Sequence, residues 1–307
     1  MAITNFNLLE VLRCPVCGAD FTDDGNSYSC AGGHRFPVAE GVPRLLTSLE
    51  GSSRSINESF GREWAYFKHG EDRSWGQAVE LRLAKFLKHV GLSEDAISGK
   101  RVLDAGCGNG TLSEAVAGLG CEVVASDLSD SVVAAHRYFS RHEGRVRFLQ
   151  TDLMRHAFKP SSFDVVYCAG VLHHTPGTRG TLARVAETVA PGGRLFVWLY
   201  WSVPGMKYRL RTRVRNVIAP LPMPVKHSLT VALGAEKALR SRITRSGDLN
   251  WRESMIGAHD FYTPRYRWEH TPDELRGWFA ELGFIDVELT ESERDGFGMV
   301  AVRPAAS

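Results

Sequence analysis

Short apolar runs alternate with stretches of helical periodicity between residues 101 and 200, and no other feature restricts the fold of this chain as strongly. Such alternation is typical of strand–helix–strand units, which build a parallel sheet with helices on both faces. A further helix near 272–282, closed by Gly283, precedes two last strands. We therefore predict an α/β fold with a seven-stranded, doubly wound sheet. Its strands are expected at residues 102–103, 121–125, 146–149, 163–168, 194–200, 285–290 and 298–302.

Glycines gather in the loop after the first predicted strand, which reads Gly106-Cys107-Gly108-Asn109-Gly110. Glycine lacks a Cβ atom and tolerates positive φ, so such a loop lets a ligand approach the backbone at the start of a helix. Asp127 ends the second strand, 17 residues after Gly110, where its carboxylate can accept from both ribose hydroxyls of an adenosine. Asp152 ends the third strand. This spacing predicts a nucleoside site at one edge of the sheet.

Further short motifs follow at matching places: Asp127-Leu128-Ser129, Phe163-Asp164, Val171-Leu172-His173-His174 and Pro191-Gly192-Gly193. Together the motifs resemble the class I methyltransferases that use S-adenosylmethionine (SAM), of methyltransferase type 11, over roughly 98–200 and 270–302. The resemblance implies a Rossmann-like sheet in which the glycines hold the methionine part of SAM and Asp127 binds its ribose. It also implies that Leu128 packs on the adenine and that Asp152 accepts from the adenine amino group. The implied cofactor residues are Asp104, Gly106, Cys107, Gly108, Asn109, Gly110, Asp127, Leu128, Asp152, Leu153 and Ala169.

Two histidines, His173 and His174, follow the fourth predicted strand at the edge of the sheet where ligands bind. Methyl transfer is an in-line displacement that requires an aligned acceptor lone pair and no metal. An acceptor hydroxyl or amine must also lose a proton, which an imidazole can take. Either histidine can therefore be the catalytic base. The alternative for each is a structural role, in orienting a neighbour or capping the next helix.

Aromatic and titratable residues gather in a loop-like segment at 259–270, before the last predicted helix, and we expect this segment to line the acceptor pocket. The stretch Phe60-Gly61-Arg62-Glu63-Trp64 resembles the helix that closes over SAM in such enzymes, and a helical lid is expected at about 56–97. Simple packing is the alternative for both segments. The candidate substrate residues are Trp64, Tyr200, Arg211, His259, Tyr262 and Tyr266.

Three cysteines and a histidine lie close together near the N-terminus, where Cys14, Cys17, Cys30 and His34 are separated by two, twelve and three residues. Three thiolates and one imidazole form the ligand set of a closed, tetrahedral zinc site. Because no coordination position is open, the zinc (Zn2+) is expected to be structural and to fold a segment too small to bury its own core. We predict a zinc ribbon at 1–50 and a methyltransferase domain at 51–307, joined by a linker at 51–55.

The ribbon resembles that of bacterial ribosomal RNA guanine-N1 methyltransferases in Asn26-Ser27-Tyr28, Cys30, His34 and Phe36, and its end resembles small zinc modules attached to several methyltransferases. This resemblance implies RNA as a rival substrate. Nucleic-acid binding relies on clustered Lys and Arg, however, and residues 1–50 carry a net charge of −3. Residues 168–174 are also similar to enzymes with small-molecule acceptors, so we favour a small organic acceptor over RNA.

Positive charge is concentrated in residues 201–258, which hold 11 Lys and Arg against 3 Asp and Glu, although the whole chain has a net charge of only +2. Apolar periodicity on both sides of a proline-rich turn at 220–224 predicts a helical insert, a hairpin at about 201–258. Lys207, Arg211 and Arg215 lie four apart on one predicted face, and one interpretation is that they attract an anionic acceptor. A solvated face, a membrane-surface helix and a subunit contact are the alternatives.

The 307 residues, 43% of them apolar, can bury one large core and one small added module. The first twelve residues lack the basic start of a signal peptide, and the longest apolar run, 195–201, is far shorter than the roughly 20 residues of a membrane span. We expect a cytoplasmic enzyme that transfers a methyl group from SAM to O, N or C of a small organic acceptor. The alternatives are an rRNA or tRNA base methyltransferase and a SAM-binding scaffold without catalysis.

Overall fold

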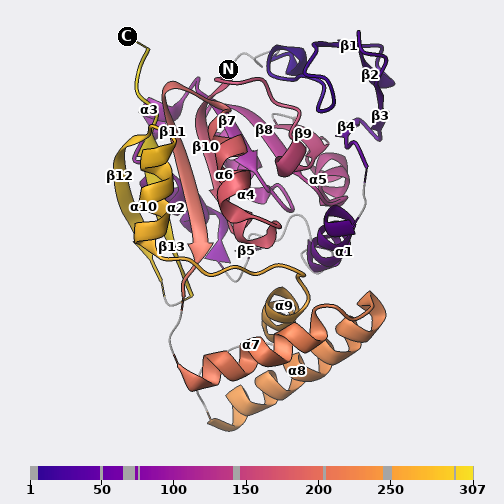
Figure 1. Ribbon diagram of the computed structural model, residues 1–307, viewed down its shortest axis with the longest axis vertical. Coiled ribbons are helices and arrows are strands. Elements are labelled where there is room, and N and C mark those ends of the chain that lie inside the picture. Colours follow the sequence, from indigo (N-terminus) through magenta and orange to yellow (C-terminus); the bar gives the residue numbers. More distant parts are fainter. Residues whose placement is uncertain are drawn as a thin grey trace.

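The computed structural model describes residues 6–48, 51–64, 73–74, 77–140, 146–202, 205–244, 251–293 and 295–306. Figure 1 shows a sheet with helices on both faces, a small group of strands at the N-terminal side and a lobe of helices beyond the sheet. Parts of the predicted lid and insert, at 65–72, 75–76, 203–204 and 245–250, lie outside the described residues.

The central sheet has the predicted seven strands, in the order β9-β8-β7-β10-β11-β13-β12. The first five in this order pair in parallel, and β13 pairs antiparallel with both β11 and β12. The α/β, Rossmann-like, doubly wound sheet is therefore confirmed. The strands are β7 (Arg101–Ala105), β8 (Glu122–Asp127), β9 (Val146–Thr151), β10 (Phe163–Ala169), β11 (Val189–Tyr200), β12 (Ile285–Ser292) and β13 (Gly296–Val302).

Two clusters of buried side chains fill the two faces of this sheet. Buried residues of α2, α3, α4 and α5 belong to one cluster, and those of α6 and α10 belong to the other. Local signals set the helix ends: Gly91 closes α2 in the left-handed conformation, and Thr271 with Glu274 forms a capping box at α10. The helices are α2 (Val79–Val90), α3 (Glu94–Ile97), α4 (Thr111–Ala117), α5 (Ser131–Phe139), α6 (Thr178–Ala186) and α10 (Pro272–Glu281).

The N-terminal ribbon extends the central sheet rather than standing apart from it. Its strand β4 pairs in parallel with β9, with Arg44 opposite Gln150 and Leu45 opposite Thr151. One sheet of eleven strands results among the described residues. A ladder of two residue pairs leaves no periodic pattern in the sequence, so this continuity could not be predicted. The ribbon elements are the 3-10 helix η1 (Leu8–Glu10) and strands β1 (Phe21–Asp23), β2 (Ser27–Cys30), β3 (Arg35–Ala39) and β4 (Val42–Leu45).

Helix α1 (Gly51–Trp64) occupies the place of the linker predicted at 51–55, and that prediction is wrong. The hydroxyl of Ser53 donates a hydrogen bond to the carboxylate of Asp152 at 2.6 Å, which holds the polar first turn of α1 against the domain. A polar composition favours a linker, but tertiary contacts override such weak local preferences.

The segment between α1 and β7 contains helices within the lid predicted at about 56–97, and also two short strands that were not predicted. Strands β5 (Arg73–Ser74) and β6 (Gln77–Ala78) form a small ladder of their own before α2. Helix α2 packs against the sheet through its buried Phe86 and Val90. Of this segment, α1 therefore serves as the covering helix, whereas α2 belongs to the core.

Three helices form the insert after β11: α7 (Met206–Ile218), α8 (Met223–Thr244) and α9 (Trp251–Tyr262). The first two correspond to the predicted hairpin, and α9 packs along α8 as a third helix. Because α9 extends to Tyr262, the loop expected at 259–270 begins four residues later than predicted. Within the described ranges, no helix is long and apolar enough to cross a membrane.

Candidate active site

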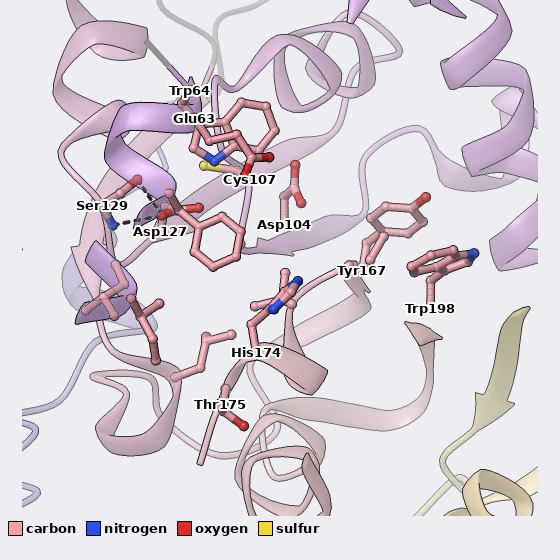
Figure 2. Close-up of a pocket in the computed structure, with 18 of the residues that line it drawn as sticks. Glu63, Trp64, Asp104, Cys107, Asp127, Ser129, Tyr167, His174, Thr175 and Trp198 are labelled. Atoms are coloured by element: carbon pink, nitrogen blue, oxygen red, sulfur yellow. Dashed lines mark hydrogen bonds between the residues drawn. The ribbon is translucent and has the colours of Figure 1, made fainter. Parts of the chain in front are cut away.

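A cavity of about 570 Å³ lies at the C-terminal ends of strands β7, β8, β10 and β11, with α1 as one of its walls (Figure 2). Open α/β sheets bind ligands at this edge. The volume is within the range of about 300–1,000 Å³ that is usual for small-molecule sites. The polar side chains that line it include Glu63, Arg82, Asp104, Asp127, Asp152, His174, Tyr200 and Asp260.

The glycine loop after β7 contains positions that only glycine can occupy. Gly106 has a φ of +91°, and a Cβ atom there would lie 2.2 Å from Cγ2 of Val171. The amides of Gly106 and Cys107 donate to the carbonyl oxygen of Ser126 at 2.7 and 3.0 Å, which fastens the loop to β8. Gly110, also at positive φ, is the N-cap of α4. The loop therefore brings bare backbone to the cavity wall.

Asp127 is held in place by the loop on one side and by its own turn on the other. Its Oδ2 atom accepts from the amide of Gly108 at 3.0 Å, and Oδ1 accepts from the amide and hydroxyl of Ser129 at 2.8 and 2.7 Å (Figure 2). Burial raises the pKa of this carboxyl, and these hydrogen bonds oppose the rise. The Ser129 hydroxyl also lies 2.7 Å from Oγ of Ser131, so it can turn away and leave the carboxylate free for ligand hydroxyls.

Two further acids at strand ends line the cavity. Asp104 accepts from the hydroxyl of Ser113 at 2.6 Å, and burial raises its pKa to about 6. Asp152 accepts from Ser53 through Oδ2 and from the amide of Met154 through Oδ1, as the N-cap of η3 (Leu153–Arg155). Both acids therefore have hydrogen-bond partners within the protein. An adenine amino group that donates to Asp152 would share the carboxylate oxygens with Ser53 and Met154.

Helix α1 presents Phe60, Glu63 and Trp64 to the cavity. The Trp64 indole lies against the glycine loop, because a Cβ atom at Gly108 would fall 2.1 Å from its Cζ2 atom. Glu63 is 1% exposed, and within the described part of the chain neither of its carboxyl oxygens has a hydrogen-bond partner. Burial raises the pKa of Glu63 well above its usual value, and the carboxylates of Asp260 and Asp127 add to the rise. The cavity wall thus contains a carboxyl group that a ligand could satisfy.

The two candidate bases, His173 and His174, both lie in η4 (Leu172–His174), but they have different surroundings. His174 lines the cavity, and its Nδ1 atom lies 2.9 Å from the carbonyl oxygen of Tyr266. A carbonyl oxygen only accepts, so Nδ1 carries the proton and Nε2 keeps its lone pair. Burial lowers the pKa of His174 to about 3, so the ring is neutral. His173 is fully buried and is not among the lining residues, which leaves His174 as the ring that can reach a ligand.

Tyr200, at the end of β11, and Asp260 of α9 complete the wall beside His174. The Tyr200 hydroxyl donates to Oδ2 of Asp260 at 2.7 Å, and Oδ1 of Asp260 lies 4.0 Å from Nε2 of His174. Burial raises the pKa of both Tyr200 and Asp260. The guanidinium carbon of Arg267 lies 3.6 Å from the centre of the Tyr200 ring. This end of the cavity combines a neutral imidazole, a phenol and a carboxyl group.

Of the predicted substrate residues, Trp64 and Tyr200 line the cavity, and the other four do not. Nε2 of His259 lies 3.1 Å from the carbonyl oxygen of Ser59. Tyr262 is buried among the helices of the insert, and Arg211 lies over the ring of Phe261 at 4.1 Å. Tyr266 contributes its carbonyl group to His174 rather than its ring to the cavity.

The predicted cofactor residues meet at the cavity except for three. Gly108, Asn109 and Gly110 are not among the lining residues and shape the loop instead. Glu63 and Asp260 line the cavity within the stretches 60–64 and 259–270, which are predicted from the sequence to lie at the cofactor and the acceptor, although neither acid is singled out there. Arg82 and Trp198 also line the cavity, and the sequence predicts no role for them.

The prediction of a cationic face on the insert is wrong at one of its three positions, Arg215. Arg215 is buried, and its guanidinium donates to the carbonyl oxygens of Pro264 and Arg265 at 2.8 and 3.2 Å. Arg215 therefore holds the chain after α9 in place and cannot attract a ligand from solution. The side chain of Lys207 lies outside the described part of the structure.

The four predicted zinc ligands converge in the ribbon, with their ligand atoms within 4.8 Å of one another. Nδ1 of His34 lies 3.7 Å from Sγ of Cys14 and 3.4 Å from Sγ of Cys30, and Sγ of Cys17 lies 3.6 Å from Sγ of Cys30. Zn–S bonds of about 2.3 Å and a Zn–N bond of about 2.0–2.1 Å give tetrahedral edges of roughly 3.5–3.8 Å. The donor set and its spacing therefore fit one zinc ion.

Comparison with known proteins agrees with this fold. Residues 103–197 match the family described as a methyltransferase domain, type 11. The chain carries this methyltransferase domain. Ubiquinone biosynthesis O-methyltransferase from Xanthomonas euvesicatoria pv. vesicatoria (strain 85-10) is 41% identical over 106 residues, 33% of this chain and 43% of that protein. The protein of the same name from Proteus mirabilis (strain HI4320) is 36% identical over 141 residues, 45% of this chain and 56% of that protein.

The chain spans about half the length of the curated relatives it matches. Among solved structures, phosphoethanolamine N-methyltransferase 2 from Haemonchus contortus, in complex with SAM, is 17% identical with a TM-score of 0.50. This match covers 88% of the present chain and 62% of that chain. At this identity, the likeness supports the fold of the methyltransferase domain alone.

Proposed function

We propose that this protein transfers the methyl group of SAM to a hydroxyl group of a small organic acceptor. The observation that carries the proposal is His174, a neutral imidazole with an unprotonated Nε2 atom, which lines the same cavity as Gly106, Cys107 and Asp127. SAM would supply an electrophilic methyl group. The chain would align the acceptor oxygen and take its proton on Nε2 of His174.

The cavity fits SAM at its glycine-loop end. Gly106 and Cys107 line this end, and the positive φ of Gly106 and its contact with Val171 leave no room for a larger residue there. Gly106 and Cys107 would hold the methionine part, Asp127 the ribose, and Leu128 would pack on the adenine. The positive charge of SAM would also compensate the buried carboxyl of Glu63, whose oxygens have no partner within the described residues.

A small acceptor fits the site better than RNA. The cavity of about 570 Å³ is bounded by α1, and carboxyl groups of Glu63, Asp260 and Asp295 line it. A phosphate backbone is bound by clustered Lys and Arg, whereas the described lining contributes Arg82 beside these carboxyl groups, so the cavity offers little attraction to RNA or to an anionic acceptor. The relatives named O-methyltransferases support a hydroxyl as the methylated group.

We further propose that the ribbon at 1–50 binds one structural zinc ion. All four ligands come from the protein, so no coordination position remains for a substrate or water. The aromatic side chains of Phe21, Tyr28 and Phe36 are buried at the junction with the sheet. Metal binding and aromatic packing would together order the ribbon, which precedes the domain at 51–307 in the sequence.

The function is tested by following a labelled methyl group. The protein is incubated with methyl-labelled SAM and either a pool of small metabolites or purified RNA, and the label is located by chromatography and mass spectrometry. We expect label in a small hydroxylated compound, with demethylated SAM as the other product. Label in RNA, or SAM binding without transfer to either pool, would overturn the proposal.

Replacing Asp127 by asparagine should weaken SAM binding by roughly 10- to 150-fold. The reason is the loss of charge-assisted hydrogen bonds to the ribose, worth about 1.5–3 kcal/mol. Calorimetric titration with SAM measures the change. The matched control is Asp95→Asn on the exposed start of α3, which should bind as the wild type does. Equal affinities of the Asp127 variant and the control would disprove the assigned role.

A further inference from the structure

Helix α7 exposes a row of large apolar side chains. Met206, Leu210, Val214 and Val217 are 84%, 62%, 39% and 70% exposed. At 3.6 residues per turn, their spacing places them within an arc of about 80°. The rest of the helix packs on the insert, with the buried Ile218 beside this arc and with Arg215 and the partly buried Tyr208 on the opposite side. We call the four exposed residues the α7 stripe.

Arginines border the α7 stripe on one side. Arg209 and Arg213 fall at this edge of the arc and are exposed, whereas Arg211 falls beyond the buried Ile218 and lies over the ring of Phe261. The helix contains no Asp or Glu. Residues 201–258 carry a net charge of +8, whereas the whole chain carries +2, so the remainder carries −6. The segment that contains α7 is therefore the most basic part of the chain.

Helix α8 adds a second exposed apolar face. Val225, Leu229 and Leu239 are 46%, 38% and 61% exposed, and their spacing places them on one side of this helix. Figure 1 places α7 and α8 in the lobe beyond the central sheet, away from the ribbon. Both helices thus carry apolar side chains that the rest of the described chain leaves uncovered.

We propose that α7 binds the surface of an anionic lipid bilayer, lying in the plane of the interface. A helix of this kind buries its apolar face among the acyl chains, and its flanking cations stay at the acidic headgroups. This is a property beyond methyl transfer and does not depend on the acceptor. Binding is peripheral, since the described helices include none that could span a membrane.

Two other partners fit the surface less well. A second copy of the chain, packed through this face, would bring Arg209 and Arg213 against the same arginines of its partner. RNA would pair with the arginines but would leave Leu210 and Val217 exposed to water. An anionic bilayer satisfies both the apolar row and its cationic border.

The position of α7 links the bilayer to the cavity. The helix starts six residues after Tyr200, which lines the cavity, and the chain returns to the cavity through Asp260 of α9. A molecule bound through α7 would therefore hold the acceptor end of its cavity close to the lipid surface.

The proposal is tested by sedimentation with vesicles of phosphatidylglycerol and phosphatidylcholine, against vesicles of phosphatidylcholine alone. The wild type should bind the anionic vesicles more tightly, and added salt should weaken binding. The variant Arg209→Gln/Arg213→Gln should bind roughly 25-fold more weakly, at about fivefold for each arginine. In the variant Met206→Gln/Leu210→Gln/Val217→Gln, the affinity for anionic vesicles should fall about tenfold for each replaced side chain that enters the acyl region.

Matched controls replace exposed residues of the same kinds elsewhere. Ile285→Gln/Leu289→Gln on β12 and Arg35→Gln/Arg276→Gln should bind vesicles as the wild type does. Calorimetric titration with SAM confirms that each variant is folded. The proposal is overturned if the wild type does not bind anionic vesicles or if the controls lose as much vesicle binding as the α7 variants. Tighter binding to total tRNA than to vesicles would overturn it too, as would a dimer that the α7 variants dissociate.

Discussion

Replacing His174 by alanine should lower kcat by roughly 100-fold, the low end of the usual contribution of a general base, because a base with a pKa of about 3 takes a proton less readily than one that titrates near neutral pH. Nε2 of His174 is the unprotonated imidazole nitrogen at the cavity wall, because Nδ1 donates to the carbonyl of Tyr266. The affinity for SAM should change little, since Asp127 and the glycine loop form the other end of the cavity. Turnover and SAM titration of the same preparation separate the two effects.

The matched control for this prediction is His173→Ala. That ring is buried behind His174 and does not line the cavity, so most of the turnover should remain. Equal losses in the two variants would mean that the pair is structural.

The pH profile gives a second readout. A base is active when unprotonated, and burial holds the pKa of His174 at about 3. Titration of this group should therefore not reduce kcat between pH 8 and pH 5. An acidic limb near pH 6.5 that disappears in His174→Ala would contradict the assignment.

Removing the zinc, by chelation or by Cys30→Ser, should unfold the ribbon. Structural zinc sites contribute about 10–16 kcal/mol of binding free energy, which in small modules is folding free energy. The wild type should contain one zinc per chain and the variant none. Hydrogen exchange of β1, β2 and β3 should then approach that of an unfolded chain.

The control for the zinc prediction is Cys121→Ala, which removes a buried thiol outside the ribbon. The Cys121 thiol donates to the carbonyl of Ile97 at 3.3 Å and lies in the core of the methyltransferase domain. This variant should lose some stability but keep its zinc. A ribbon that stays protected from exchange without metal would show that aromatic packing alone is sufficient.

The sequence predicts those parts of the fold that repeat a local pattern. The strands of the central sheet were recognisable because each is a short apolar run beside a helical stretch. The glycine loop and Asp127 follow from fixed spacing along the chain, and so do the four zinc ligands. In each case, the residues that act together are also close in sequence or occupy equivalent strand ends.

The parts that the sequence does not predict depend on contacts between distant segments. Glu63 and Asp260 are separated by almost 200 residues and meet because α1 and α9 pack together at the cavity. Arg215 belongs to a basic run, yet it is buried because it satisfies carbonyl oxygens after α9. The helical state of 51–55 depends likewise on Ser53 and its bond to Asp152. No local propensity encodes such partners.

The parallel pairing of β4 with β9 has a consequence for self-association. An uncovered outer strand offers free amide and carbonyl groups to any other chain, and the ribbon occupies those of Gln150 and Thr151. A chain that begins after the ribbon would expose this border. Such a truncated protein should precipitate at concentrations where the intact one stays dispersed, even if its catalytic apparatus were unharmed.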